Sequence, residues 1–528
     1  MTKHGILNTP EVDKLAIAVE EAARAANISN PRFVEPARGT LDRAKSRRHH
    51  IVFGRRGSGK TSLLAKAAAD LTVDRRPIAF VNLETFKGHS YPDVLLSVLI
   101  ESLDHFKKWF DTAAVNPASK TSFWRRLFGA RPTRPPLHKG DVQPIIKTIE
   151  SQTAALKEQL FGPETSAVVK TTEHAQEEAS TESAKASIAA GPASIGASAE
   201  AATRSASTSR IVSESRQQKI DFLHRSLIEF QKLFRQVTEV SDGDAFLFLD
   251  DLYHIRRADQ PSVIDYFHRI AKGSRLWIKI GTIRHRTDWY RHSDPPIGLK
   301  LGDDADEIDL DLTLEKYDLA KRFLVSVLSG IATGTGTGNV RSLLAGTAID
   351  RLVLASGGVA RDFLALFRKS IDIARERGEG PRGPRIVAQD VNQAAGEHDA
   401  AKRDELKRDT LEERAQVERA FDAAKTFCIE TANCNCLLIQ KDRTDPGAML
   451  IEELVDLRML HLVQSRVTIS DRAGKLYVAY MLDLGQYTGE RKRRDLEMIP
   501  FWHKRGKDRL RRVKLIFDPQ PPPPGGEA

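Results

Sequence analysis

The sequence predicts an α/β fold, with a parallel sheet in the first half and a block of helices followed by a smaller domain in the second. Short apolar runs alternate with helical segments between residues 49 and 110, which is typical of strands joined by crossover helices. The same pattern returns at residue 244, after a long polar interruption. From about residue 313 the segments have helical periodicity, and two β-rich runs follow around a Ser-Asp-Arg-Ala-Gly turn.

Length and composition narrow the class of protein. A chain of 528 residues, of which 41% are hydrophobic, is long enough for two or three domains with sizeable cores. Its three cysteines, at 428, 434 and 436, argue against a disulfide framework, and they lack the paired spacing and fourth ligand of a zinc site. We find no signal-peptide pattern and no apolar run long enough for a membrane span, so a soluble cytoplasmic protein is expected.

The first elements can be placed in order. Residues 11–27 have the periodicity of a helix, within an N-terminal segment that we place at 1–39. A short β-run ends at Phe53 and leads into a glycine-rich loop and a helix. Residues 77–86 form a second apolar strand, and residues 91–110 form a helix with a strong apolar face.

An insertion interrupts the α/β pattern at residues 113–239. Its middle, about 163–216, is rich in Ser, Ala, Thr and Glu and has no aromatic residue, so we expect it to be disordered or only transiently helical. Flanking helices near 142–160 and 217–239 are placed to form an antiparallel pair. The sheet then resumes with strands at 244–255 and 275–286, which extends the α/β core from residue 40 to about 312.

Three further segments follow the core. Residues 313–385 are predicted to form a helical lid, and a Gly/Pro/Arg stretch ends this block. Residues 390–487, helices followed by a hairpin, fit a winged-helix-like domain. Residues 488–528 are predicted to be a basic tail, because residues 491–514 contain eleven Lys or Arg against three Asp or Glu.

The segment after the first strand matches the phosphate-binding pattern G-x-x-x-x-G-K-[ST], the P-loop, in full. The motif comprises Gly54, Arg55, Arg56, Gly57, Ser58, Gly59, Lys60 and Thr61, and Ser62 follows it. The glycines let successive N–H groups point at phosphate oxygens, and the helix that begins at Lys60 adds its positive dipole end. Lys60 can reach the β- and γ-phosphates, and the Thr61 hydroxyl can ligate Mg²⁺. The loop therefore predicts binding of a nucleoside triphosphate.

Two acids follow the four apolar residues at 246–249. A buried strand of this kind delivers its C-terminal carboxylates to the phosphate edge of the sheet. We expect Asp250 to hold Mg²⁺, directly or through water, and Asp251 to orient the attacking water as base.

The next strand ends in polar residues that could sense or assist hydrolysis. Thr282 and Arg284 are candidates for a γ-phosphate sensor, and Arg286 is a candidate arginine finger. Arginines around a surface turn are the simpler interpretation of the same pattern.

Taken together, the P-loop, "LFLDD", "KIGTIR" and the later "SGGVARDFLALFRKS" resemble an AAA+ ATPase, closest to the origin-recognition initiators and the related STAND switch ATPases. The resemblance covers roughly 40–112 and 240–377. It implies ATP as the nucleotide, a nucleotide-dependent homo-oligomer, and a lid arginine after a Gly-Gly turn, where Arg361 stands. The core also resembles that of bacterial P-loop ATPases, some of which lie near phage-defence genes.

The chain departs from the typical pattern of this family in three places. It has Asp-Asp in place of Asp-Glu at the second acid, Ala360 where STAND proteins tend to have proline, and a long insertion. These departures favour a slow switch over a motor.

The downstream partner is left open between two classes. The basic residues after 490, with Phe501 and Trp502 between them, suit a nucleic-acid backbone, so an ATP-controlled DNA-binding protein is one hypothesis. The other is a nucleotide-gated signalling or scaffold protein, possible in anti-phage defence, whose winged region binds a protein effector. A metabolic kinase has little support, because no substrate-binding signature accompanies the P-loop.

Overall fold

The computed structural model describes residues 5–23, 33–111, 137–183, 196–241, 243–406, 411–488 and 496–519. Within these residues, no helix combines the length and the apolar character that crossing a membrane requires.

Five parallel strands form the central sheet, in the order β2–β3–β4–β1–β7. The strands are β1 (His49–Phe53), β2 (Ile78–Asn82), β3 (Ala245–Asp250), β4 (Leu276–Thr282) and β7 (Ala305–Asp309). The register pairs Phe53 with Thr282 and Asn82 with Asp250, so the carboxyl ends of neighbouring strands meet at one edge. Every residue of β3 is buried, as expected for a strand covered on both faces. The predicted α/β class with a parallel sheet is confirmed.

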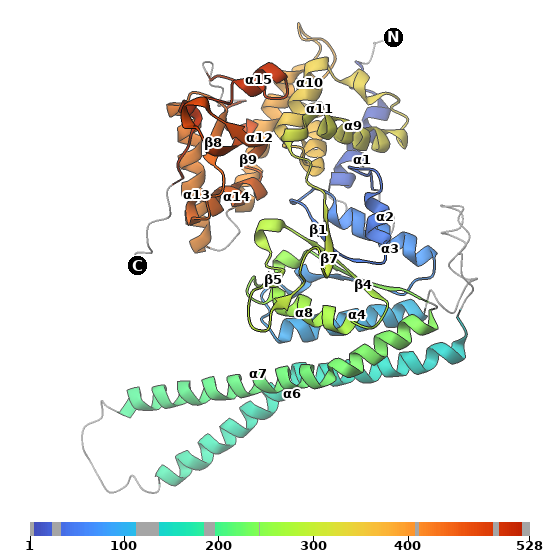
Figure 1. Cartoon of the computed structure of the whole chain (residues 1–528). Coiled ribbons are helices and arrows are strands. Elements are labelled where there is room, and N and C mark those ends of the chain that lie inside the picture. The colour runs from blue at the N-terminus through green and yellow to red at the C-terminus, as the bar shows by residue number, and fades with distance from the viewer. Residues whose placement is uncertain are drawn as a thin grey trace.

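Helices cover both faces of this sheet. They are α2 (Thr40–Lys45), α3 (Lys60–Val73), α4 (Asp93–Trp109) and α8 (Gln260–Ala271). Helix α3 packs against β2, β3 and β4, whereas α4 packs against β2 and α8 against β4. Figure 1 shows α2 and α3 on one side of the sheet and α4 and α8 on the other. A small pair of strands, β5 (Tyr290–Arg291) and β6 (Ile297–Gly298), lies against α8.

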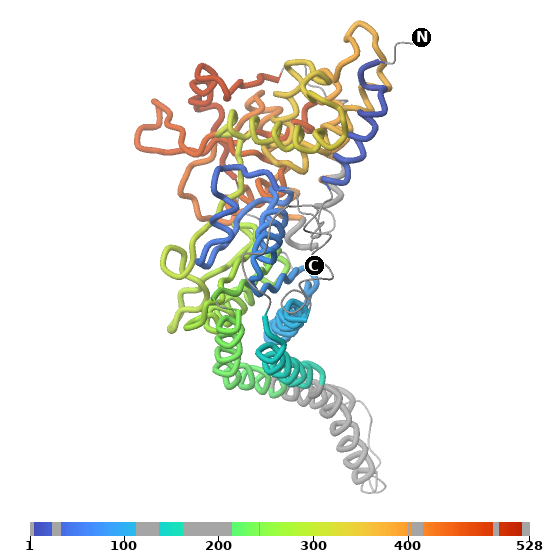
Figure 2. The backbone as a smooth tube through the Cα atoms, turned by 90° about the vertical axis from the view of Figure 1, so that its right-hand side faces the viewer, coloured from blue at the N-terminus to red at the C-terminus, as the bar shows by residue number. Residues whose placement is uncertain are grey.

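The insertion contains two long helices, α6 (Lys139–Ser183) and α7 (Gly196–Val240), which pack against each other and, through α6, on α4. Figures 1 and 2 both show this pair directed away from the C-terminal half. The backbone is helical at 163–183 and 196–216, where the sequence predicts disorder or only transient helix, and Ala, Glu and Gln are strong helix formers. Residues 112–136 and 184–195 lie outside the described residues.

The base of this helical pair is anchored by apolar contacts. Ile149 of α6 and Phe230 of α7 are fully buried, and Phe234 makes an edge-to-face contact with Phe106 of α4 at 5.5 Å between ring centroids. The pair is therefore part of the core of the α/β domain where it meets α4.

A helical block follows the sheet and contains α9 (Tyr317–Thr333), α10 (Gly346–Ser356) and α11 (Ala360–Arg377). The N-terminal helix α1 (Pro10–Ala23) packs against α9 and α11, and its Leu15 and Val19 have no exposed surface. Helix α12 (Ala388–Leu406) packs against α10 and α11 and leads into the last part of the chain.

The C-terminal module is a three-stranded antiparallel sheet with two helices. Its elements are β8 (Cys436–Gln440), β9 (Leu460–Thr468), β10 (Leu476–Leu482), α13 (Leu411–Thr426) and α14 (Pro446–Asp456). The strand order is β8–β10–β9, and β9 and β10 form a hairpin. Its core is continuous with that of helices α9 to α11.

Residues 496–519 differ from the expected tail, because they fold back onto this module. Phe501, Leu510 and Leu515 are buried, and Phe517 donates its backbone N–H to the carbonyl of Leu438 in β8 at 2.8 Å. A short helix, α15 (Lys504–Asp508), presents basic side chains on the outside. The apolar residues that lie between the cations pack against the module and bind the segment to it.

The C-terminal module touches the α/β domain through α14. Arg286, after β4, donates to Glu453 at 3.2 Å, and His285 lies 3.4 Å from Glu452. Asp456, the last residue of α14, is buried, and its Oδ2 atom has no hydrogen-bond partner in the described part of the chain. Burial, and then the charge of Asp311, raise the pKa of Asp456 to about 7.

We predict that Asp456→Asn stabilises the protein more at pH 8 than at pH 5. In the unfolded chain this carboxyl ionises near its ordinary pKa of 3.8, whereas in the native site it stays protonated up to a pH of about 7. The native state is therefore destabilised increasingly, relative to the unfolded chain, as pH rises to about 7. The amide removes that cost, and the gain in unfolding free energy should grow by about 2 kcal/mol between the two pH values. Thermal unfolding measures it, with Asp471→Asn on the exposed hairpin turn as control. An equal gain at both pH values would contradict the assignment.

Candidate nucleotide-binding site

The P-loop occupies the turn between β1 and α3. Gly57 and Gly59 have φ of 81° and 98°, the left-handed region in which other residues are strained. A Cβ on Gly54 would lie 2.2 Å from Ser58 Oγ, so the loop curls too tightly for any side chain there. Helix α3 then begins at Lys60 and directs its N-terminal N–H groups at the hollow of the loop.

Two features of the loop fit a phosphate group. The Ser58 hydroxyl is buried and has no hydrogen-bond partner among the residues that the structure describes. Lys60 is also buried, and its Nζ donates to the loop carbonyls of Gly54 and Arg55 at 2.8 and 3.3 Å. Burial lowers the pKa of Lys60, against the opposing charges of Asp251 and Asp250. An orphaned hydroxyl and an ammonium held on backbone carbonyls are groups that phosphate oxygens would satisfy.

The magnesium ligands expected from the sequence lie together. Asp250 ends β3 with 1% of its surface exposed, and the Thr61 side chain hydrogen bonds to its carboxylate. The Asp251 N–H also donates to Asp250 Oδ1 at 3.0 Å. Burial, and then the charge of Asp251, raise the pKa of Asp250 to about 6. A carboxylate and a hydroxyl oxygen in contact suit Mg²⁺, which prefers oxygen ligands.

Gly281 provides the space for Asp250 and was not singled out from the sequence. A Cβ at this position of β4 would lie 2.3 Å from Asp250 Oδ1 and 2.9 Å from Leu64 Cδ1. A glycine inside a strand pattern often marks a position where another group approaches the backbone closely. The glycine in "KIGTIR" could therefore have indicated this contact.

Asp251 follows β3 with a φ of 57°, in the left-handed region that is uncommon for residues other than glycine. The turn after it brings Tyr253 over the P-loop, with its ring centroid 5.8 Å from both Lys60 Nζ and Arg56 Cζ. Asp251, half-buried, is thus near the phosphate cradle, as expected for a group that orients water.

The two sensor candidates lie at the carboxyl end of β4 and just after it, where the Thr282 carbonyl accepts from the Gly54 N–H of the P-loop at 3.2 Å. Their side chains have other partners in this structure. Thr282 is fully buried, and its hydroxyl is bonded to that of Thr287 at 2.5 Å. Arg284 pairs with Glu307 of β7 at 2.9 Å and lies over the Phe53 ring at 4.0 Å. The sequence could not predict the contact with Glu307, because β7 comes near Arg284 only through the order of the strands in the sheet. Sensor roles for both residues stay predictions.

The lid contacts the P-loop directly. The Arg361 N–H, in the first turn of α11, donates to the Gly57 carbonyl at 3.3 Å, and the charge of Arg361 contributes to the lowered pKa of Lys60. Arg55 is buried, with its N–H on Asp311 Oδ1 at 2.9 Å and its guanidinium on the Gly357 carbonyl at 3.2 Å. Ser62 lies half-buried in the first turn of α3.

A buried charge network continues from the lid into the C-terminal module, and sequence reasoning missed it. The His461 ring packs so closely on Gly357 that a Cβ there would lie 2.0 Å from Nδ1. His461 Nε2 lies 2.9 Å from Asp483, which also accepts from Lys402 at 2.8 Å. These residues come from three separate elements, so no local pattern could reveal them.

The next acid of this network is Asp362 in α11. Arg458 donates to it at 2.6 Å, and Lys402 lies 3.7 Å away. Burial alone would raise the pKa of Asp362, but Arg458 and Lys402 hold it well below its usual range. The first turn of the lid helix is thereby fixed to the C-terminal module.

Comparison with known proteins gives matches only among solved structures: no family model and no curated protein matches the sequence. Aeropyrum pernix Orc1 in complex with DNA is 12% identical, with 88% of this chain and 93% of that chain covered and a TM-score of 0.35. Drosophila ORC bound to DNA is 12% identical, with 89% of each chain covered and a TM-score of 0.32. A Walker-type ATPase of Pyrococcus abyssi is 11% identical, with 85% and 93% covered and a TM-score of 0.36.

We predict that Gly281→Ala weakens magnesium-dependent binding of ATP at least about tenfold. The new methyl group must displace Asp250 Oδ1, which accepts from the Asp251 N–H, since the methyl group and this oxygen cannot share the space. Titration with a fluorescent ATP analogue, with Mg²⁺ and with EDTA, measures the effect. Gly330→Ala, in an exposed turn of α9 where a Cβ meets nothing within 4 Å, is the matched control. Equal magnesium-dependent affinity in both variants would contradict the role of Gly281.

The groups of the candidate site meet at one edge of the sheet, at the carboxyl ends of β1 and β3. They are the backbone N–H groups of the P-loop, Lys60, Thr61, Asp250 and Asp251. This arrangement is an α/β fold with a parallel five-stranded sheet and a P-loop at its carboxyl edge.

Proposed function

We propose that this protein is a slow ATPase that couples its nucleotide state to DNA binding by the C-terminal module. The observation that carries the proposal is the contact of Thr61 with Asp250 beside the buried Lys60. The site supports binding of ATP and Mg²⁺ at this position, and the family resemblance favours adenine.

Each residue has a separate task in hydrolysis. The loop N–H groups, Ser58 and Lys60 bind the β- and γ-phosphates, and Thr61 and Asp250 hold Mg²⁺, which neutralises phosphate charge when bound. Asp251 orients the attacking water and accepts its proton. The oxygen of that water bonds to the γ-phosphorus, the bond to the bridging oxygen breaks, and ADP leaves.

The lid contacts support coupling to the C-terminal module. Arg55 and Arg361 join the P-loop to the two ends of the Gly357–Arg361 turn. On the other side, His461 of β9 packs on Gly357, and Arg458, just before β9, donates to Asp362. A phosphate in the loop would compete for the same groups, so nucleotide state would bias the position of the module. Nucleotide-dependent assembly into a homo-oligomer is a second output of such a change.

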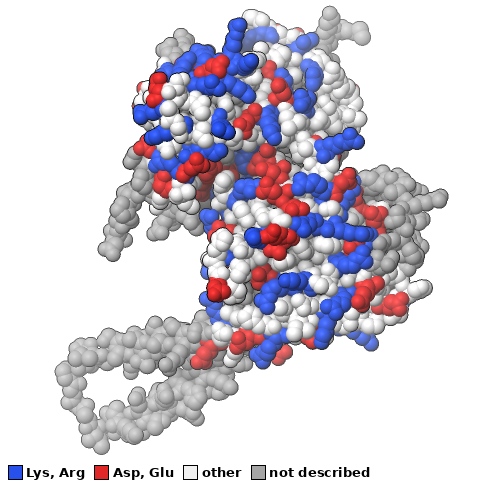
Figure 3. Space-filling model, viewed as in Figure 1, with Lys and Arg blue, Asp and Glu red and all other residues white. Residues whose placement is uncertain are grey.

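Charge on the C-terminal module supports DNA as the partner. Figure 3 shows Lys and Arg side chains along the upper rim of this module, where α15 lies. Glu497 pairs with Arg509, Arg512 and Lys514. Four other cations on this rim are exposed: Lys504, Arg505, Lys507 and Arg511. The hairpin of β9 and β10 beside helices α13 and α14 supports a winged-helix-like arrangement. Phosphate contacts of this kind give affinity without sequence preference.

We predict that Asp251→Asn binds ATP normally and lowers kcat about 100-fold. The amide keeps the size of the side chain and cannot accept the proton of water. Phosphate release and titration with a fluorescent ATP analogue measure the two quantities separately. Asp318→Asn, exposed in the first turn of α9, is the control. Normal turnover by Asp251→Asn would show that this residue is not the base.

We predict that replacing the four exposed cations with alanine weakens DNA binding. The negative slope of log K against log [salt] should become shallower by about 3. Substitution is preferred to deletion of 491–514, because Phe501 and Leu510 of this segment are buried in the module. Fluorescence anisotropy with a duplex, in ATP and in ADP, measures both quantities.

The matched control replaces four lysines on the helical pair with alanine. These are Lys139, Lys147, Lys157 and Lys232. Wild-type protein that binds nucleotide and ignores DNA in ATP and in ADP would instead favour a protein effector as the partner of the module.

A further inference from the structure

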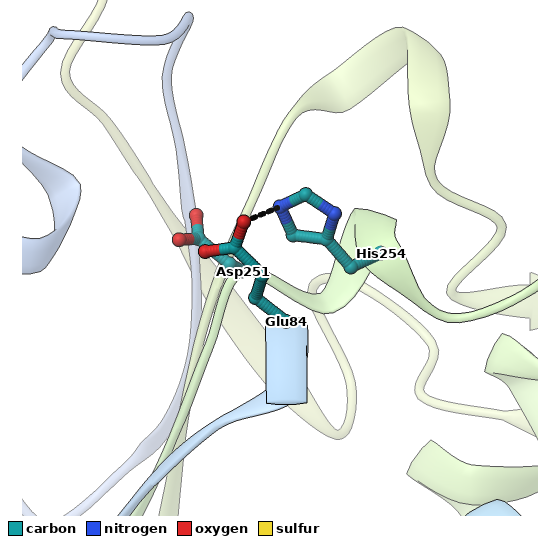
Figure 4. A group of neighbouring side chains, drawn as sticks. All are labelled: Glu84, Asp251 and His254. Atoms are coloured by element: carbon teal, nitrogen blue, oxygen red, sulfur yellow. Dashed lines mark ion pairs between the residues drawn. The ribbon is translucent and has the colours of Figure 1, made fainter. Parts of the chain in front are cut away.

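Three titratable side chains converge beside the paired aspartates. Glu84 comes from the 3₁₀ turn Leu83–Phe86 after β2, whereas Asp251 and His254 flank the turn after β3. Figure 4 shows all three directed toward one another. One ligand atom of each lies within 4.8 Å of the others, and His254 Nε2 is 3.9 Å from Glu84 Oε1.

The backbone after β3 places the imidazole here. Asp251 reverses the chain in the left-handed region, and the His254 N–H donates back to the Asp251 carbonyl at 3.1 Å. A residue other than glycine in this conformation costs free energy and is enriched at functional sites. The result is a tight turn that sets His254 beside the carboxylate proposed as base.

The three residues differ in exposure. The His254 side chain is 7% exposed, whereas that of Glu84 is 60% exposed. The Tyr253 ring packs on the His254 ring at 4.4 Å between centroids, and the same tyrosine ring lies near Lys60 and Arg56 of the P-loop. The imidazole thus lies between a half-buried carboxylate near the P-loop and a carboxylate in solvent.

The charges around His254 leave it able to accept a proton at neutral pH. Burial lowers the pKa of His254, and Arg56 and Lys87 act in the same direction. Glu84 and Asp251 oppose this shift by stabilising the imidazolium. The ring is therefore neutral near pH 7. When it takes up a proton, its two anionic neighbours stabilise the imidazolium.

Accepting the ATP hydrolysis proposed above, we propose that His254 relays the proton of the attacking water from Asp251 to Glu84 and solvent. The water oxygen bonds to the γ-phosphorus as the bond to the ADP oxygen breaks. The proton of that water goes to Asp251, then to His254, and leaves through Glu84. Asp251 regains its charge for the next turnover.

The test is chemical rescue of His254→Ala in the full chain. We expect kcat to fall about 100-fold, with unchanged binding of a fluorescent ATP analogue. Added imidazole should restore turnover at least about tenfold, and this rescue should increase with pH through the imidazole pKa of about 7, since only the neutral base accepts a proton. Glu84→Gln should lower kcat less, because water can replace an exposed carboxylate. His292→Ala, on an exposed turn, is the control and should show neither effect.

Four outcomes would overturn the relay. Normal turnover by His254→Ala, while the wild type hydrolyses ATP, removes the relay and leaves the ATPase in place. Loss of turnover without any response to imidazole, in a variant that still binds the ATP analogue, assigns His254 a packing role. Binding of Mn²⁺ alone by the wild type, lost in His254→Ala, assigns the three side chains to a metal instead. A wild type that binds ATP without hydrolysing it removes the proposed ATPase activity and the relay together.

Discussion

The burial of one carboxylate constrains the rest of this molecule. Asp250 is enclosed by β3, β4 and the first turn of α3, where its charge is costly. The Thr61 side chain, the Asp251 N–H and the nearby Lys60 offset that cost only in part, because its pKa remains raised to about 6. Ionised Asp250 would be needed to hold a cation, so Mg²⁺ at this site would displace a proton when pH is near that value. Under the proposed function, this edge of the sheet would receive a dication and a polyphosphate together.

Sequence reasoning located the parts of this site that are local. The P-loop and the acids after β3 are contiguous motifs whose geometry follows from a strand, a turn and a helix. The partners of Thr282 and Arg284 could not be predicted, since Thr287 and Glu307 come into reach only through the turn after β4 and the strand order. The packing of residues 496–519 was missed for a different reason: a high density of cations concealed the apolar residues that bind the segment to β8.

The distribution of apolar and polar contacts indicates which parts move as one body. Helices α9 to α11 and the C-terminal sheet share a continuous apolar core and the buried charges around Asp362 and Asp483. Breaking such a core would cost far more than nucleotide binding supplies. Contacts from this body to the α/β domain are polar instead: Arg55 with Gly357, Arg286 with Glu453, and Arg361 with Gly57. In the proposed switch, a change of nucleotide would act on this polar interface and move the helical block and the C-terminal module together.

The size of that interface sets what the nucleotide must do. Two of these contacts are hydrogen bonds, which contribute about 0.5–1.5 kcal/mol each, and one is a partly exposed ion pair, which contributes about 0–1 kcal/mol, so together they hold this arrangement by only a few kcal/mol. Shifting a two-state equilibrium from about 1:99 to 99:1 requires about 5.5 kcal/mol of differential affinity. A phosphate that accepts hydrogen bonds from Lys60 Nζ and from the Arg361 N–H in place of their present carbonyl partners acts on groups that join the P-loop to the helical block. Tight binding alone would not suffice, because a ligand with equal affinity for both states shifts nothing. The proposed switch thus depends on the γ-phosphate end of the site, where the lid turn and the P-loop share hydrogen bonds.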